Sequence, residues 1–199
     1  MTGRMLIAGI GNIFLGDDGF GPEVAKRLAA ASLPGWVRVA DYGISGMHLA
    51  YDLADGYDAA ILIDAAPRGD KPGTVTVLDA AADHRPDAGP ADEAIGASRL
   101  FDAHGMQPDV VLGVLDMLGE AGPARILVVG CEPASVDYGM ELSEPVANAV
   151  DEAVRVVLDL VAEAGRDRET PGSGGSPGRP GPGPETTDKG VSHVPWHSR

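Results

Sequence analysis

The sequence predicts an α/β fold, namely a three-layer α/β/α sandwich around a mostly parallel sheet of about five strands, with one antiparallel strand at an edge. Two observations support this prediction. Short apolar runs alternate along the chain with segments whose apolar residues recur at helical spacing, which is a β-α-β-α rhythm. The apolar runs are also continuous rather than alternating, which is typical of strands buried on both faces of a parallel sheet.

The expected elements follow that rhythm along the chain. The strands are residues 5–10, 37–41, 59–64, 74–78 and 125–129. The helices are residues 19–31, 47–53, 108–120 and 144–164. Residues 74–78 follow Pro72-Gly73 and lie too close to the third strand for a crossover helix, so we expect that strand to pair antiparallel at an edge.

Composition divides the chain into a folded domain over residues 1–165 and a Gly/Pro-rich tail over residues 166–199. Runs such as Pro180-Gly181-Pro182-Gly183-Pro184 cannot bury enough apolar surface to offset about 1–2 kcal/mol of backbone entropy per residue. We therefore expect a disordered, dispensable tail. The alternative is a weak metal site, because His193 and His197 flank Trp196.

Charge and cysteine content restrict the class of partner. The formal net charge is −15, so phosphate backbones and anionic lipids are repelled, and we expect neither nucleic acid nor a membrane as partner. Cys131 is the only cysteine and needs no oxidising compartment. Glycines and acids interrupt the first apolar run before it could act as a signal peptide. We expect a cytoplasmic protein that acts as a monomer on a protein or metal-bearing partner.

The first expected strand ends in a loop that is rich in glycines and acids. Gly9-x-Gly11 resembles a dinucleotide-binding turn, but Phe14 replaces the third glycine, and Asp17 and Asp18 lie where a pyrophosphate would dock. Adjacent negative charges oppose phosphate and suit a cation, so a nucleotide-binding regulator is the last of the alternatives. One acid suffices to cap the next helix and interact with its dipole, each of which stabilises the helix by about 0.3–1 kcal/mol. The other acid is therefore available for a functional role.

Further polar candidates follow other strands. Asp64 and Asp41 end two apolar runs and should reach the same sheet edge as the first loop, although Asp41 equally suits a hydrogen bond to its own turn. His104 precedes the helix expected at 108–120, and the competing imidazoles are His48 and His84. Two carboxylates and one imidazole can hold a divalent transition metal and leave positions open for another ligand.

Other nucleophiles find little support in the sequence. A G-x-S-x-G motif is absent from the expected folded domain, residues 1–165. Cys131 follows a strand, where it suits a small buried residue as well as a reactive thiol.

Several motifs resemble those of the hydrogenase maturation protease family, peptidase family M52. Gly9-Ile10-Gly11-Asn12, followed by Asp17-Asp18-Gly19-Phe20-Gly21, is similar to the opening signature of the family. Three later segments match in the same order: Asp41-Tyr42-Gly43-Ile44-Ser45-Gly46-Met47, Ile61-Leu62-Ile63-Asp64-Ala65 and Gly130-Cys131-Glu132-Pro133. The resemblance covers residues 5 to about 160.

The resemblance implies an aspartic-type, nickel-dependent endopeptidase that removes the C-terminal extension of a nickel-loaded NiFe-hydrogenase large-subunit precursor. Asp18 and Asp64 then correspond to the acids that contact the metal and take part in catalysis, and His104 corresponds to the imidazole ligand. Nickel is supplied by the precursor rather than held permanently. Asp17 is a secondary candidate for positioning or base chemistry.

The same resemblance gives the loop after the second strand a role in choosing the precursor, through Asp41, Gly43 and Gly46.

Two questions about mechanism and function stay open at this point. Metal-polarised water and a carboxylate general base are both reasonable ways to break the peptide bond. A nonenzymatic nickel-sensing checkpoint or chaperone with the same ligands is the alternative function, and it would leave the size of the precursor unchanged.

Overall fold

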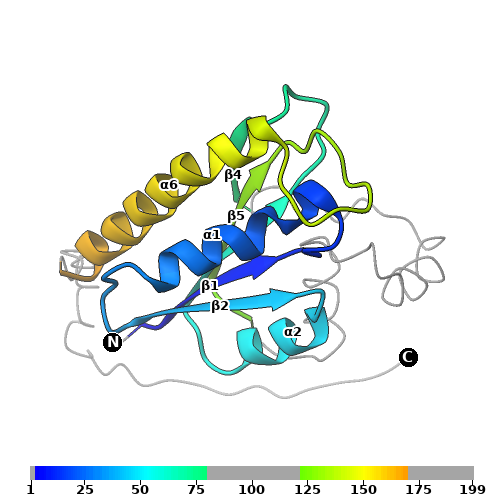
Figure 1. The fold of residues 1–199 in the computed structure, drawn as a ribbon. Coiled ribbons are helices and arrows are strands. Elements are labelled where there is room, and N and C mark those ends of the chain that lie inside the picture. Colours follow the sequence, from blue (N-terminus) through cyan, green and yellow to red (C-terminus); the bar gives the residue numbers. More distant parts are fainter. Residues whose placement is uncertain (1–2, 80–121, 170–199) are drawn as a thin grey trace, which may run out of the picture.

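The computed structural model describes residues 3–79 and 122–169 (Figure 1). The helix expected over residues 108–120 lies outside these ranges, as do His84, His104 and the candidate metal ligands of the tail. The remaining predicted elements can be compared directly with the structure.

Five strands form one sheet. They are β1 (Met5–Ile10), β2 (Val37–Gly43), β3 (Ala59–Ala65), β4 (Val75–Asp79) and β5 (Arg125–Cys131), arranged in the order β2-β1-β3-β5-β4. β1 pairs in parallel with β2 and β3, and β3 pairs in parallel with β5. β4 pairs antiparallel with β5 at the edge. The predicted mostly parallel sheet with one antiparallel edge strand is therefore confirmed.

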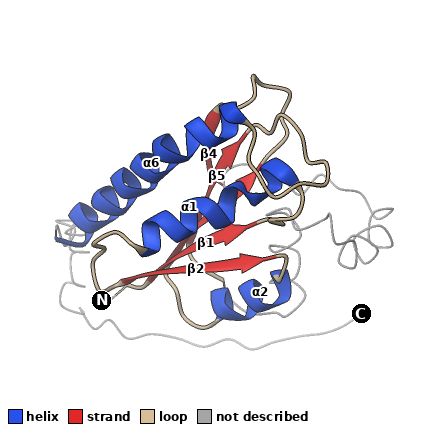
Figure 2. Cartoon of the chain, in the orientation of Figure 1, coloured by secondary structure: helices blue, strands red, loops and turns tan. Residues whose placement is uncertain are grey.

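Helices cover both faces of the sheet. A short 3-10 helix η1 (Gly16–Gly19) leads into α1 (Phe20–Ala29), and the later described helices are α2 (Gly46–Ala54) and α6 (Glu144–Glu169). Figure 2 shows α1 and α6 side by side on one face and α2 on the opposite face. The three-layer sandwich is the arrangement expected from the sequence.

The central strands are apolar throughout because each face has its own core. In β1, Ile7 contributes to the core under α1 and α6, while its neighbours Leu6 and Ala8 contribute to the core under α2. β3 divides in the same way between Ile61 and Leu62. Successive side chains of a strand point to opposite faces, so a strand covered on both sides needs an unbroken apolar run.

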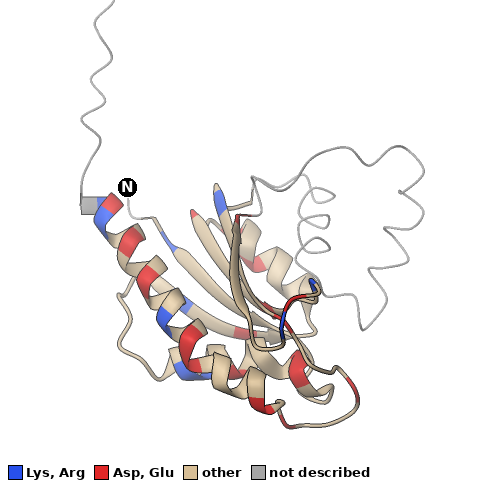
Figure 3. Ribbon diagram, turned by 90° about the horizontal axis from the view of Figure 1, so that it is seen from above, with Lys and Arg blue, Asp and Glu red and all other residues tan. Residues whose placement is uncertain are grey.

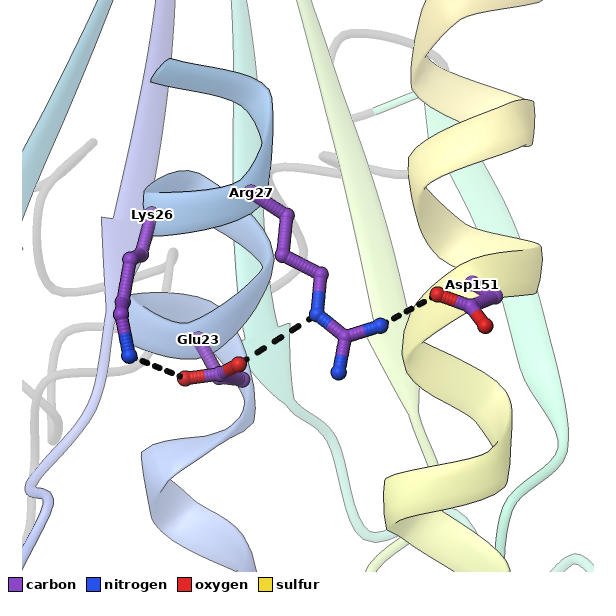
Figure 4. Close-up of polar contacts among 4 residues, drawn as sticks. All are labelled: Glu23, Lys26, Arg27 and Asp151. Atoms are coloured by element: carbon purple, nitrogen blue, oxygen red, sulfur yellow. Dashed lines mark hydrogen bonds and ion pairs between the residues drawn. The ribbon is translucent and has the colours of Figure 1, made fainter. Parts of the chain in front are cut away.

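An ion pair also links the two helices of this face. Arg27 on α1 pairs with Asp151 on α6, and Glu23 holds both Lys26 and Arg27 at 3.3 Å (Figure 4). Glu23 is partly exposed and its partners are exposed, and ion pairs at such positions contribute about 0–1 kcal/mol each. Apolar packing therefore dominates the attachment of α6 to α1.

The end of α6 differs from the expected domain boundary. We expected the folded domain to end at residue 165, but α6 continues to Glu169. Its Arg168 stacks over the ring of Trp36 at 4.4 Å and donates a hydrogen bond to the carbonyl of Gly3. The folded segment therefore extends at least to Glu169. Within the described ranges, helices long and apolar enough to cross a membrane are absent.

Glycines allow α1 to approach the sheet very closely. A Cβ atom at Gly9 would lie 2.5 Å from the carbonyl oxygen of Gly21. A Cβ atom at Gly21 would collide with the carbonyl oxygens of Ile10 and Ile63. The first turn of α1 therefore rests directly on the backbone at the ends of β1 and β3.

This close approach makes a prediction about Gly21→Ala. Helix propensity alone favours alanine inside a helix by about 1 kcal/mol. The backbone collision should reverse that sign, and we expect a loss of about 2–4 kcal/mol in the free energy of unfolding, measured by urea denaturation. The control is Gly35→Ala, since a Cβ there meets no atom within 4 Å. A Gly21→Ala variant as stable as the control would contradict the close approach.

Candidate functional site

Three loops meet at the carboxyl edge of the sheet and form the candidate site. They are residues 11–19 after β1, 66–74 after β3 and 132–143 after β5 (Figure 1). Ligands of open parallel sheets bind at this edge, outside the ends of the strands. The sequence predicted that Asp18 and Asp64 would reach it, and both lie there.

Asp18 is held by the loop that carries it. Its Oδ2 accepts a hydrogen bond from the backbone N–H of Asn12 at 2.6 Å, and its own N–H donates to the carbonyl of Leu15. The Asp18 residue remains partly exposed. A partly exposed carboxylate with a fixed position is well suited to contact a ligand from solution.

Asp64 lies deeper, at the end of β3. The residue is only 5% exposed, and its Oδ1 accepts a hydrogen bond from the N–H of Ala65 at 2.8 Å. Burial raises the pKa of Asp64 well above its ordinary value, and the negative charge of Asp18 raises it further. The two acids therefore interact electrostatically, and a cation at this position would favour the ionised form of Asp64.

Asp17 is bonded to the loop between β5 and α6 and performs a structural task. It is 1% exposed, and its carboxylate accepts hydrogen bonds from the N–H groups of Ala134, Ser135 and Ser143 and from the Ser143 hydroxyl, at 2.6–3.0 Å. Burial opposes ionisation, but these donors outweigh it and lower the pKa of Asp17. The geometry favours the positioning role of Asp17 over base chemistry.

Glu132 has a similar role that the sequence did not reveal. Its carboxylate accepts hydrogen bonds from the N–H groups of Arg68 and Gly69, which lower its pKa and fix the turn that follows Asp64. Glu132 comes directly after the last apolar strand, so the strand-end rule that selected Asp41 and Asp64 could have found it.

The loop after β2 lies beside the loop after β1. Gly43 has a left-handed conformation with φ 51°, and its carbonyl accepts a hydrogen bond from Gly11 at 3.0 Å. Asp41 accepts a hydrogen bond from Gly43 N–H at 2.8 Å, which is the turn-forming role considered as its alternative. Gly46 begins α2 and is buried. These residues therefore shape the loop, and their role in choosing a precursor stays a prediction.

The other candidates contribute little to the described site. His48 is exposed on α2, and His104 lies outside the described residues. Burial, with the charge of Asp17, raises the pKa of Cys131 to about 12, as befits a buried and unreactive thiol. In residues 3–79 and 122–169, groups of three or more His, Cys, Asp or Glu side chains able to hold a metal ion are absent.

Known proteins resemble this chain over most of its length. A family model described as hydrogenase maturation protease matches residues 22–160. The hydrogenase expression/formation protein HupM of Azotobacter chroococcum is 34% identical over 170 residues, which cover 83% of this chain and 76% of the relative. The hydrogenase 2 maturation protease of Escherichia coli is 30% identical over 166 residues, which cover 81% of this chain and 93% of the relative.

Solved structures agree with this result. The hydrogenase maturating endopeptidase HybD of Escherichia coli superposes with a TM-score of 0.62 at 29% identity, and the match covers 81% of this chain and 94% of that one. The range matched by the family model contains Asp41, Asp64 and His104, whereas Asp17 and Asp18 precede it.

We expect Asp17→Ala to lower the free energy of unfolding by about 2–4 kcal/mol, because it leaves buried donors without their charged acceptor. The pKa of Asp17 is lowered in the folded state, so its contribution is present at neutral pH and is lost as the pH falls through that lowered pKa. Urea denaturation at several pH values measures both effects. The exposed Asp159→Ala is the control, and equal stability of the two variants would contradict the assignment.

Asp64→Asn should have the opposite effect on stability. The pKa of Asp64 is raised in the folded state, so wild-type stability falls as the pH rises from the unfolded pKa, about 3.9, through the raised value. The amide keeps the acceptor for Ala65 and carries no charge. At neutral pH we expect a gain on the order of 1 kcal/mol that disappears in acid. A pH-independent difference would refute the raised pKa.

Proposed function

The chain belongs to the hydrogenase maturation protease family, as its motifs predicted, and we propose that it is a cytoplasmic endopeptidase that removes the C-terminal extension of a nickel-loaded NiFe-hydrogenase large-subunit precursor. Nickel is part of the substrate in this proposal. The cytoplasmic location rests on the cysteine content, since the single cysteine needs no oxidising compartment.

The observation that carries the proposal is the electrostatic interaction between Asp18 and the buried Asp64 at the carboxyl edge of the sheet. The free site holds a buried carboxylate whose ionisation is opposed by burial and by a neighbouring carboxylate. A divalent cation that arrives with the precursor would offset both effects that oppose the ionisation of Asp64. The site therefore favours a metal-loaded partner over a metal-free one. We propose His104 as the third ligand, in line with the resemblance.

The environment of Asp64 bears on how the peptide bond is broken. A carboxylate whose pKa lies above its ordinary value takes up a proton more readily near neutral pH, which is what a general base requires. This supports Asp64 as a general base in addition to its contact with nickel, and Asp18 is the other acid that contacts the metal. Under this assignment, the Asp41–Gly46 loop contributes to precursor choice.

Cleavage of a purified nickel-loaded precursor, followed by mass spectrometry, tests the proposal. We expect loss of the C-terminal peptide with the wild type, and a fall in kcat/KM on the order of 100-fold or more in Asp18→Asn, Asp64→Asn and His104→Ala. Nickel-free precursor should remain uncut. Asp159→Asn on the exposed face of α6 is the matched control for the acid-to-amide changes.

Two outcomes would change the proposal in different ways. Nickel-dependent binding without any loss of the peptide would favour the nonenzymatic checkpoint or chaperone. Full cleavage by His104→Ala would remove that residue from the ligand set and leave the two acids in place.

A further inference from the structure

Large apolar side chains lie exposed on two loops beside the candidate site. Phe14 is 57% exposed and Tyr138 is 93% exposed, although side chains of this size are usually buried at least in part. We call the following set the apolar platform: Ile13, Phe14, Val136, Tyr138 and Met140. It occupies residues 13–14 of the first loop and residues 136–140 of the β5–α6 loop.

The two loops form one body. Leu15 and Gly139 make a parallel bridge, in which Gly139 N–H donates to Phe14 at 3.0 Å and Gly16 N–H donates to Gly139 at 2.8 Å. The buried carboxylate of Asp17, in the first loop, also accepts hydrogen bonds from the β5–α6 loop and so holds the two loops together. An apolar surface on a fixed backbone loses little conformational entropy on binding, which favours a role in association.

The platform is continuous with the candidate site and with a groove. Asn12, which holds Asp18, precedes Ile13 in the same loop. Ile13 and Met140 also line a groove of about 590 Å³ between α1 and the start of α6. The platform therefore begins at the residue that follows Asn12, whose N–H holds Asp18.

The charges of the groove indicate what it accepts. Its basic residues, Lys26 and Arg27, are already paired with Glu23 and Asp151 (Figure 4). Its remaining acids, Asp41 and Glu141, have no ion pair with any described basic residue. The groove therefore suits an apolar segment that carries a positive charge.

A second copy of this chain fits the platform poorly. The net charge is −15, and Figure 3 shows acidic residues distributed over the helices and loops. A symmetric dimer through the platform would bring Asp137 and Glu141 of both copies together, and like charges at an interface are unfavourable.

We propose that the apolar platform and its groove dock the large-subunit precursor, through an apolar segment of that partner that bears a basic side chain. This inference rests on the proposed function and adds a second contact to it. Nickel recognition selects the metal-loaded state, whereas the platform binds polypeptide whether or not nickel is present.

The test compares Phe14→Ser/Tyr138→Ser with Tyr51→Ser/Val77→Ser, a control pair of exposed apolar residues on α2 and β4. With nickel-loaded precursor, we expect the platform variant to raise KM at least about tenfold at unchanged kcat, and the control pair to change neither. Binding of nickel-free precursor, followed by fluorescence anisotropy, should weaken by a similar factor. Thermal melting should give the same midpoint for all variants.

Charge offers an independent check of the ligand chemistry. We expect Glu141→Lys to raise KM about fivefold at low salt, with a smaller effect at high salt, because it would repel a basic side chain. Glu152→Lys makes the same change on α6, outside the residues that line the groove. Equal effects of the two variants would refute a basic ligand in the groove.

The outcomes separate this inference from the proposed function. If the wild type cuts the precursor and the platform variant cuts it with the same KM, docking at the platform is refuted and the peptidase stands. If the wild type never cuts, the peptidase fails, and the anisotropy measurement decides on docking alone. A platform variant that dissolves a wild-type dimer at unchanged KM would assign the surface to a second copy and overturn the inference.

Discussion

The candidate site depends on the contact between the first turn of α1 and the backbone of the sheet. Gly9 and Gly21 meet without side chains between them, so the helix begins directly above the ends of β1 and β3. The same contact places η1, with its two acids, at the edge where Asp64 ends its strand. Wider spacing at this point would separate Asp18 from Asp64, and the electrostatic interaction between them would weaken with distance.

Three buried acids at this edge differ in what surrounds them. Asp17 and Glu132 accept several backbone hydrogen bonds, which favour their ionised forms and fix the neighbouring loops. Among the described residues, Asp64 accepts a hydrogen bond from Ala65 alone, and the charge of Asp18 acts on it. Asp17 and Glu132 are thus structural anions, whereas Asp64 is a carboxyl group that readily takes a proton. The number of hydrogen-bond donors around each carboxylate decides between the two roles.

The sequence predicted the features that depend on local pattern. Strands buried on both faces leave continuous apolar runs, and acids at strand ends reach one edge, so the sheet and the positions of Asp18 and Asp64 could be anticipated. The hydrogen-bond partners of Asp17 could not be anticipated, because its donors follow it by more than a hundred residues in the chain. The end of α6 was also missed, since its last turn is charged and is held by the stacking of Arg168 on Trp36 rather than by apolar periodicity.

The strand order also determines when the sheet and the candidate site can form during synthesis. β3 and β4 are consecutive in the chain, yet β5 lies between them in the sheet. Until β5 leaves the ribosome, β3 has an open edge and the donors for Asp17 do not exist. Strands that are distant in the chain pair slowly, and until they pair their edges stay exposed. A chain that ends before β5 therefore lacks the donors that hold Asp17, and its unpaired β3 edge is open to association with other chains.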